Sequence, residues 1–360
     1  MLVAPASTVK PAHPLTPYPR GWYLIAHSDE VEPGEVRPLH LFGRDLAVFR
    51  SATGRAHVVD AHCPHLGAHL GHGGKVVGEC IRCPFHGWEF AAESGDCVRI
   101  ANGDAPPPRA RLGRWHVTEV NEMILAWFHE AGEAPEWQVP ELPAFAEPGW
   151  SRWSPTSWDL KARIQDLAEN DADVSHSPVM HSLTDALPTI AMDAEGPRCT
   201  WTIEMAMKPS ALGLPKVPLL GALDRVLPRL PSRVEVLRWG LCVGWIRQWT
   251  ELPGGLKFAS QTLATTTPID DTRVRLTFRH RVRALPIPGL TALMRRKYAR
   301  LFDDVAREDV VIWEHKIYRM RPLATRTDWA ILRFRRWSRQ FYDPAHWDAA
   351  MGREGAEYQD

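Results

Sequence analysis

The sequence predicts an α+β protein of two unequal parts, a small all-β domain followed by a larger domain in which a central antiparallel sheet packs against helices. Short β-branched runs bounded by glycine fill residues 21–130, which is typical of strands and tight loops. A proline-rich stretch without a regular period follows at 131–150 and predicts a linker. Residues 151–360 hold strand-like segments followed by a strongly patterned helix, and residues 1–20 are expected to form an extended lead.

Local patterns predict the elements of each domain. In the first domain, they predict strands at 46–50, 57–63, 75–83, 87–90 and 123–128. In the second, they predict a helix over 158–173, strands over 197–209 and 233–251, a long hairpin over 257–283 and a helix over 298–319. The proline-broken apolar segment 215–231 would suit a flexible lid or an ordinary core loop.

The composition excludes several functional classes. The 360 residues carry 43 Lys and Arg against 43 Asp and Glu, and this zero net charge argues against a generally basic nucleic-acid binder. No apolar run reaches the roughly 18 residues that a membrane span needs, and the N-terminal residues lack the apolar core of a secretory signal. We therefore expect a cytoplasmic protein, in which clustered cysteines and histidines indicate metal binding before disulfides.

Two short motifs, CPH and CPFH, supply the candidate ligands Cys63, His65, Cys83 and His86. Two thiolates and two imidazoles can bind a tetrahedral zinc ion. They can also hold a [2Fe–2S] cluster in which two histidines replace two cysteines on one iron, the Rieske arrangement. Each motif supplies one Cys and one His, a spacing that favours the cluster over zinc. Cys80 imitates a zinc knuckle with Cys83, but we expect it to be a free thiol on a strand.

A second candidate metal site lies in the stretch AENDADVSHSPVMHS, which contains Asp173, His176 and His181. On an ideal helix the two histidines would be about 140° apart. Pro178 lies between them and is expected to kink the chain, which would bring His181 back towards His176. Two histidines and one carboxylate form the facial triad of oxygen-activating non-haem Fe(II) sites.

We expect the carboxylate of this triad from the helix near the C-terminus. The apolar stripe of that helix comprises Leu301, Val305, Ile312 and Trp313. Asp309 is four residues from Val305 and four from Trp313, so it points inward with the stripe. A carboxylate on a buried stripe must be paired or bind metal. A buried ion pair is therefore the other explanation for Asp309, and Asp304 is the alternative ligand.

The cluster motifs lie in DAHCPHLGAHLGHGGKVVGECIRCPFHGWEF, and the second site shows Asp-x2-His-x4-His followed by REDVVIWEHKIY. With these features, about residues 18–130 and 158–325 resemble the Rieske non-haem iron oxygenases. The resemblance implies a Rieske [2Fe–2S] domain followed by a helix-grip (Bet v1-like) catalytic domain. It implies that the cluster is held by Cys63, His65, Cys83 and His86, and the mononuclear Fe(II) by His176, His181 and Asp309.

The same resemblance implies roles for three further residues. Trp88 would pack beside the cluster. Asp173 would form a hydrogen-bonded bridge for electrons between His86 of one subunit and His176 of the next. Asn170 would lie near the iron, unless it is simply a polar residue at a helix end.

The segments YPRGWYLI, ENDADVSH and IWEHKIYRMRP resemble the steroid and sterol branch of the family, the ketosteroid hydroxylase oxygenases and cholesterol 7-desaturases. This implies a homotrimeric oxygenase component that hydroxylates or desaturates a bulky apolar substrate. Electrons would come from NAD(P)H through a separate flavin reductase or ferredoxin, because the chain has no GxGxxG motif of its own. A small aromatic or other non-steroid substrate, including one that is demethylated, is the alternative within the family.

Two other functional classes explain less of the sequence. An electron-transfer protein would account for the Cys-His motifs alone, and a zinc-stabilised interaction protein would account for neither their alternation nor Asp309. The basic segment 333–339 would suit an acidic ferredoxin, but a solvated helix face is the favoured explanation. The sequence leaves the exact substrate, the regiochemistry and the choice between hydroxylation, desaturation and demethylation open.

Overall fold

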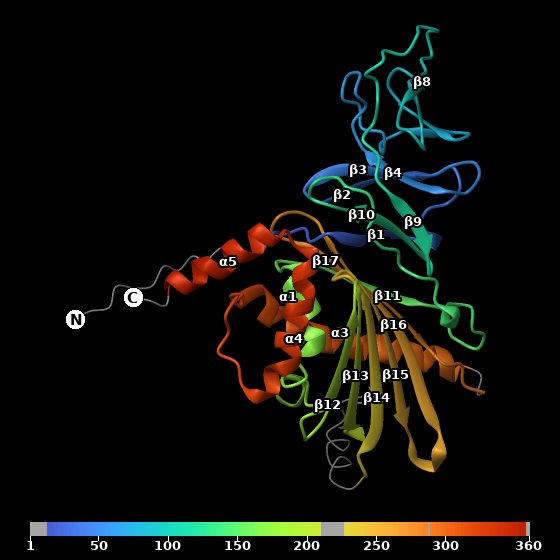
Figure 1. Cartoon of the computed structure of the whole chain (residues 1–360). Coiled ribbons are helices and arrows are strands. Elements are labelled where there is room, and N and C mark those ends of the chain that lie inside the picture. Colours follow the sequence, from blue (N-terminus) through green and yellow to red (C-terminus); the bar gives the residue numbers. More distant parts are fainter. Residues whose placement is uncertain (1–12, 210–226, 287–288, 358–360) are drawn as a thin grey trace.

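The computed structural model describes residues 13–209, 227–286 and 289–357. It has two domains stacked end to end, with small sheets at one end and a large curved sheet at the other (Figure 1). Most of the segment 215–231 lies outside the described residues. The predicted α+β fold class is confirmed by this architecture.

The N-terminal domain contains three antiparallel sheets in the described part of the chain. The first orders β1 (Gly21–His27), β10 (Met123–Phe128) and β9 (Val117–Val120). The second orders β2 (Val36–Leu41), β3 (Arg44–Arg50) and β4 (Ala56–Asp60). The third orders β5 (Lys75–Val77), β6 (Cys80–Arg82), β7 (Glu89–Ala91) and β8 (Cys97–Arg99), and it lies farthest from the second domain (Figure 1).

The C-terminal domain is built on a seven-stranded antiparallel sheet in its described residues, with the order β11-β17-β16-β15-β14-β13-β12. The strands are β11 (Ser154–Leu160), β12 (Thr189–Glu195), β13 (Arg198–Met207), β14 (Leu230–Trp239), β15 (Val243–Glu251), β16 (Lys257–Pro268) and β17 (Val274–Val282). The predicted hairpin over 257–283 is confirmed as β16 and β17. Residues 233–251 form a second hairpin rather than one strand, because the chain turns back at Gly240 (φ +61°).

Four α-helices are described, and they pack on and beside this sheet (Figure 1). They are α1 (Ile164–Glu169), α3 (Leu290–His315), α4 (Trp329–Ser338) and α5 (Pro344–Glu357). The helix predicted over 158–173 was too long, since residues 158–160 belong to β11 and α1 begins only at Ile164 and ends at Glu169. Trp158 pairs there with Leu276 of β17, so a long-range strand contact overrides the local pattern.

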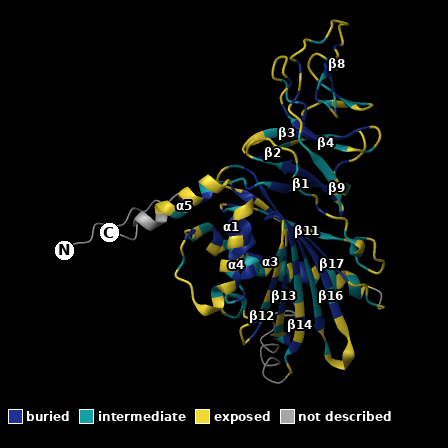
Figure 2. Cartoon of the chain, viewed as in Figure 1, coloured by how far each residue is buried: buried dark blue, intermediate teal, exposed yellow. Residues whose placement is uncertain are grey.

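The two domains share a hydrophobic core. Trp22, Leu125 and Trp127 of the first domain form one buried cluster with Trp239 and Trp245 of the second. Figure 2 shows that burial is concentrated along the strands and where the two domains meet, while α4 and α5 expose their outer faces. Continuous burial of large aromatic rings across this junction holds the domains in one orientation.

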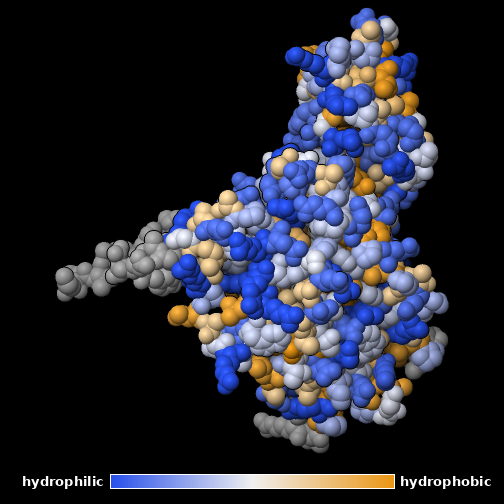
Figure 3. Space-filling view, viewed as in Figure 1, coloured by the Kyte–Doolittle hydropathy of each residue, from blue (hydrophilic) through white to orange (hydrophobic). Residues whose placement is uncertain are grey.

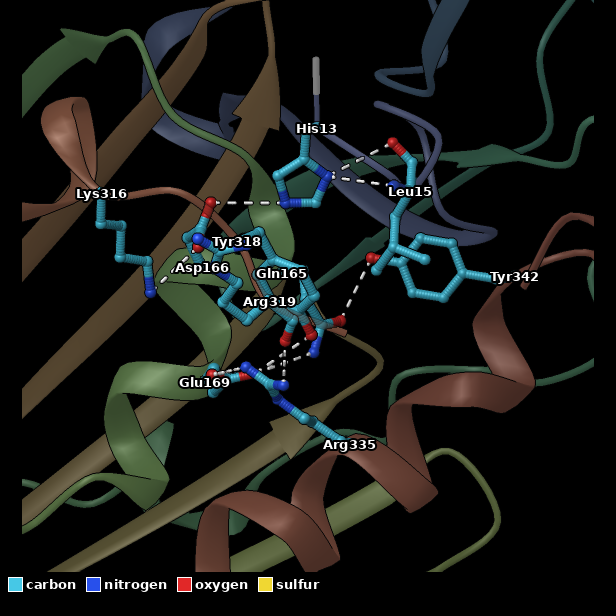
Figure 4. Close-up of polar contacts among 10 residues, drawn as sticks. All are labelled: His13, Leu15, Gln165, Asp166, Glu169, Lys316, Tyr318, Arg319, Arg335 and Tyr342. Carbon is cyan, nitrogen blue, oxygen red and sulfur yellow. Dashed lines mark hydrogen bonds and ion pairs between the residues drawn. The ribbon is translucent and has the colours of Figure 1, made fainter. Parts of the chain in front are cut away.

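A buried polar network fixes α1, all six of whose residues are buried. The guanidinium of Arg335 on α4 makes two bonds to the carboxylate of Glu169, of 2.7 and 2.8 Å. Lys316 lies 2.9 Å from Asp166, and the hydroxyl of Tyr342 donates to Gln165 over 3.2 Å (Figure 4). Buried charges need such partners. The network therefore holds the short helix that leads directly into residues 170–173, beside the candidate iron site.

Candidate active site

The two Cys-His motifs lie on two similar loops at the tip of the N-terminal domain. In each loop the glycine four residues after the cysteine donates to that cysteine's carbonyl, Gly67 to Cys63 over 2.9 Å and Gly87 to Cys83 over 3.2 Å. Gly67 and Gly87 have φ of +76° and +68°, a region that favours glycine. A Cβ on Gly87 would also lie 2.8 Å from that of Ala101. These turns aim both pairs of side chains at one point.

The two kinds of ligand differ in exposure. Cys63 and Cys83 are each only 3% exposed, whereas His65 and His86 are exposed. The two imidazole rings lie 4.7 Å apart, and Trp88 stacks on His65 with ring centres 4.5 Å apart and an angle of 8°. Burial raises the pKa of the Cys63 thiol to about 11, so a bound metal is needed to keep it as a thiolate.

The four donors at the tip, two thiols and two imidazoles, have the chemistry of a Rieske cluster. In the described part of the chain, sets of donor atoms within 4.8 Å of one another occur at His176, His181 and Asp309, and at His129, Glu133 and Glu136. The four Cys and His donors do not form such a set, although the ligands of one zinc ion lie only about 4 Å apart. In the second set, Arg20 already pairs with Glu136 at 3.1 Å. The tip therefore has the donor chemistry for a [2Fe–2S] cluster.

The candidate iron ligands converge between α3 and the segment after α1. The Oδ1 of Asp309 lies 3.2 Å from the Nε2 of His181 and 3.9 Å from the Nε2 of His176. The side chain of His181 is 2% exposed, and its Nε2 has no hydrogen-bond partner among the residues that the structure describes. A buried, unpartnered imidazole nitrogen facing a carboxylate fits a metal ion. His176, His181 and Asp309 could therefore hold mononuclear iron.

The turn between the histidines explains how they meet. Residues Ser177–His181 form a π-helical turn with Pro178 in its first turn, and it ends at Ser182, whose φ is +52°. Because residues five apart pair in a π turn, His176 and His181 approach until their ring centres are 5.0 Å apart. The kink expected at Pro178 is present, in the form of a widened turn.

Asp309 and Asp304 face different environments on α3. Asp309 is 6% exposed, next to the buried Ala306 and Trp313, whereas Asp304 is exposed. Ile312, which we placed on the inward stripe, is 47% exposed, so that part of the prediction was wrong. The inward face of α3 instead continues through Ala306, three residues before Asp309.

Two neighbours position the triad. Asn170 donates from Nδ2 to the Oδ2 of Asp309 over 3.3 Å. Glu308, which our sequence reasoning missed, lies with Oε2 2.8 Å from the Nδ1 of His181. A carboxylate on the second ring nitrogen fixes the tautomer in which Nε2 is free for a metal. Burial lowers the pKa of His181, but Asp309 and Glu308 outweigh it and raise the pKa.

Asp173 lies on the other side of the triad. Its Oδ1 accepts from the amide of Ser175 at 3.1 Å and from its hydroxyl at 2.6 Å. Its Oδ2 is 3.6 Å from the Nδ1 of His176, longer than a hydrogen bond. Burial raises the pKa of Asp173, but contacts with His176 and Ser175 outweigh it and lower the pKa to about 2. The carboxylate is ionised and half-exposed, next to one candidate iron ligand.

A cavity between the sheet and α3 opens onto the triad. Its sheet side is lined by the apolar side chains of Ile203, Met205, Val234, Val236, Ile246 and Leu276. Arg238 borders it as well, in a buried ion pair with Asp171. Alternate residues of each strand face the same side, so the strands together give one broad apolar wall.

Comparison with known proteins defines the class of this chain. Residues 21–112 match the Rieske [2Fe-2S] domain, and residues 126–342 match the 3-ketosteroid 9alpha-hydroxylase C-terminal domain. The chain belongs to the Rieske non-haem iron oxygenases, enzymes that use a [2Fe–2S] cluster and a mononuclear iron. The family predicted from the sequence is confirmed.

Particular relatives fall in the steroid and sterol branch. The chain is 30% identical over 350 residues to the cholesterol 7-desaturase of Xenopus laevis, covering 95% of this chain and 75% of the relative. It is 27% identical over 343 residues to a probable 3-ketosteroid-9-alpha-monooxygenase oxygenase component of Rhodococcus rhodochrous, covering 93% and 82%.

Solved structures support the fold. Dicamba monooxygenase bound to dicamba aligns with a TM-score of 0.68 at 19% identity, covering 89% of this chain and 96% of that chain. Pseudomonas putida NdmA with caffeine aligns with a TM-score of 0.68 at 17% identity, covering 88% and 89%. No helix in the described residues is long and apolar enough to cross a membrane.

Proposed function

We propose that the chain is the oxygenase component of a multicomponent monooxygenase that hydroxylates or desaturates a steroid or sterol. The main observation in support of this proposal is the apolar cavity that ends at His176, His181 and Asp309. A wide hydrophobic wall with few polar groups suits a rigid apolar ligand. The relatives named for sterol desaturation and ketosteroid oxygenation support the same substrate class.

The roles of the chain's residues follow from their contacts. His176, His181 and Asp309 would hold iron by three donors and leave the cavity side open, while Asn170 and Glu308 orient two of those donors. The bound iron supplies oxygen activation, with electrons from the Rieske cluster. The apolar wall would exclude water and place a C–H bond of the substrate beside the open side rather than on the metal.

The path of electrons leads us to propose a homotrimer. In one chain the cluster loops lie at the end of the molecule remote from α3, which favours transfer between subunits over transfer within one chain (Figure 1). His86 of one subunit would therefore approach Asp173 and His176 of the next. The exposed apolar side chains Leu66 and Phe85 beside the cluster, and Val179 beside the iron site, are 65%, 62% and 82% exposed. They offer contact surface for such an assembly, although hydrophobic side chains elsewhere on the face in Figure 3 form only small scattered groups.

We also propose that electrons from NAD(P)H reach the cluster only through a separate reductase or ferredoxin. The basic segment 333–339 does not present all of its basic side chains to such a partner. Arg335 within it turns inward to Glu169, whereas Arg333, Arg336 and Arg339 remain exposed.

A single turnover tests the proposed function. Chemically reduced protein would be mixed with oxygen and a panel of sterols, 3-ketosteroids and small aromatic acids, and products would be identified by mass spectrometry. A steroid that gains one oxygen indicates a hydroxylase, and one that loses two hydrogens indicates a desaturase. Turnover of aromatic acids alone would retain the oxygenase and overturn the steroid assignment.

A further inference from the structure

The cavity has a polar group on its apolar wall, at Gln248 of β15 and Tyr298 of α3. Both side chains line the cavity, and the Tyr298 hydroxyl donates to the Oε1 of Gln248 over 3.4 Å. Their neighbours towards the iron are apolar, including Ile246 and Phe302. A polar pair on such a wall gives a ligand one point at which it can hydrogen-bond.

The amide of Gln248 is held from behind. Its Nε2 donates to the hydroxyls of Ser232 and Thr250 over 3.4 and 3.3 Å, and it lies 3.3 Å from the sulfur of Met207. These contacts fix which way the amide points, so that Oε1 faces Tyr298. The bond of 3.4 Å to Tyr298 is long, near the limit for a hydrogen bond. A ligand oxygen that lies between or beside the Gln248 Oε1 and the Tyr298 hydroxyl could therefore form a shorter hydrogen bond than the two atoms form with each other.

A second observation concerns polar side chains that pack behind Tyr298, outside the lining of the cavity. Behind Tyr298, the Nε2 of His280 and the Oγ of Ser260 are buried and make no hydrogen bond in the described part of the chain. The rings of His280 and Tyr298 lie 5.7 Å apart. Buried polar atoms usually find partners. Because neither side chain lines the cavity, the polar atoms that a ligand oxygen would meet at this end are those of Gln248 and Tyr298.

The polar pair is remote from the candidate iron. Tyr298 and Asp309 are both on α3, eleven residues apart. At 1.5 Å per residue this is about 16 Å along the helix axis. Side chains on a helix lean towards its N-terminus, so the Tyr298 hydroxyl does not shorten this distance along the axis.

We propose that Gln248 and Tyr298 form a subsite that binds a hydroxyl or carbonyl oxygen at the end of the substrate farthest from the carbon that is oxidised. This inference rests on the proposed function, because it assumes that the cavity holds a long, rigid and mainly apolar substrate. The Oε1 of Gln248 can accept a hydrogen bond from an alcohol and the hydroxyl of Tyr298 can donate one to a ketone, so the subsite takes either group. The two residues act as specificity determinants and set which end of the substrate enters first.

Equilibrium binding to the oxidised holoprotein tests this subsite without turnover. The ligands are a 3-ketosteroid, a 3-hydroxysterol and the corresponding steroid hydrocarbon without oxygen. Their binding is measured by the quenching of tryptophan fluorescence. Gln248→Met removes the amide and keeps the length of the side chain. Ile246→Met, two residues along the same face of β15, is the matched control for a change of shape. Tyr298→Phe removes only the hydroxyl.

We expect Gln248→Met and Tyr298→Phe each to weaken binding of an oxygen-bearing ligand by about two- to tenfold, the value of one neutral hydrogen bond. Binding of the hydrocarbon should stay unchanged, which also shows that the variants are folded, and Ile246→Met should affect all three ligands alike. Equal loss for the hydrocarbon, or no loss for the oxygen-bearing ligands, overturns the subsite alone. If the wild-type protein binds none of the three ligands, the proposed steroid function is overturned together with the subsite.

Discussion

The amide Nδ2 of Asn170 donates to the Oδ2 of Asp309 over 3.3 Å, while the other oxygen of Asp309 faces both candidate iron-binding histidines. One oxygen is thus held by the protein and the other is free for a metal. Asn170 immediately follows α1, which the network around Glu169 and Arg335 fixes in place. The geometry of the iron site therefore depends on a helix that supplies none of its ligands.

Asn170→Ala should loosen the carboxylate of Asp309 and weaken binding of the mononuclear iron by about 10- to 100-fold, as loss of such outer contacts does elsewhere. Iron content per chain and the visible absorption of the cluster are the measurements, and only the iron content should fall. Asn102→Ala, in an exposed turn of the first domain, is the control. Full retention of iron in Asn170→Ala would mean that the hydrogen bond does not position Asp309.

Asp309→Ala should abolish the mononuclear iron and leave the cluster spectrum intact, because the two metal sites share no ligand. Asp304→Ala is the matched control on the same helix and should keep both metals, since Asp304 is exposed. Metal analysis with absorption spectroscopy distinguishes the two variants. Loss of iron from Asp304→Ala with retention in Asp309→Ala would reverse the assignment.

Asp173→Ala should retain both metals and slow electron transfer, because it removes the ionised group next to His176. The measurement is the rate at which the reduced cluster is reoxidised when oxygen and substrate are added. Asp185→Ala provides a control carboxylate, since Asp185 is on the surface and pairs with Lys208. A wild-type rate in Asp173→Ala would contradict the proposed bridge.

Glu169→Gln should destabilise the C-terminal domain by about 3 kcal/mol, because it leaves the Arg335 side chain, which is only 13% exposed, without its ion pair. The double variant Glu169→Gln with Arg335→Met should recover part of this loss, since no unpaired charge then remains. Arg336→Met, on the exposed side of α4, should change the free energy of unfolding by less than about 0.5 kcal/mol. Denaturant unfolding followed by tryptophan fluorescence gives these values, and equal stability of Glu169→Gln and the wild type would refute the role of the network.

Burial lowers the pKa of His280 to about 3, from an ordinary value of 6.5 in the unfolded chain. Below pH 6.5 the His280 imidazole is therefore protonated in the unfolded chain but stays neutral in the folded protein. The free energy of unfolding consequently falls as the pH falls. Between pH 6.5 and 5.5 the expected contribution is about 1 kcal/mol. His280→Phe should flatten this dependence, whereas His315→Phe, at an exposed position, should not. An unchanged slope of unfolding free energy against pH in His280→Phe would show that another group is responsible.

Much of the candidate site could be predicted because its signals are local. Cys63, His65, Cys83 and His86 lie within 24 residues, and glycine follows each pair where the loop must turn. The inward position of Asp309 could be predicted from its spacing to Trp313 on a helix of regular period. Local reasoning failed at Ile312, because the ends of an apolar stripe depend on which neighbour covers the helix.

The sequence by itself determined the types of the candidate ligands, the order of the two domains and the hairpin over 257–283 of the large sheet, since spacing and periodicity act along the chain. Only the tertiary structure decided that Asn170 reaches Asp309, 139 residues away, and that Tyr298 meets Gln248, 50 residues away. It also decided that Trp158 lies in a strand, through its pairing with Leu276. These contacts depend on how sheet and helix pack in three dimensions, and packing between distant segments leaves no periodic trace in either one.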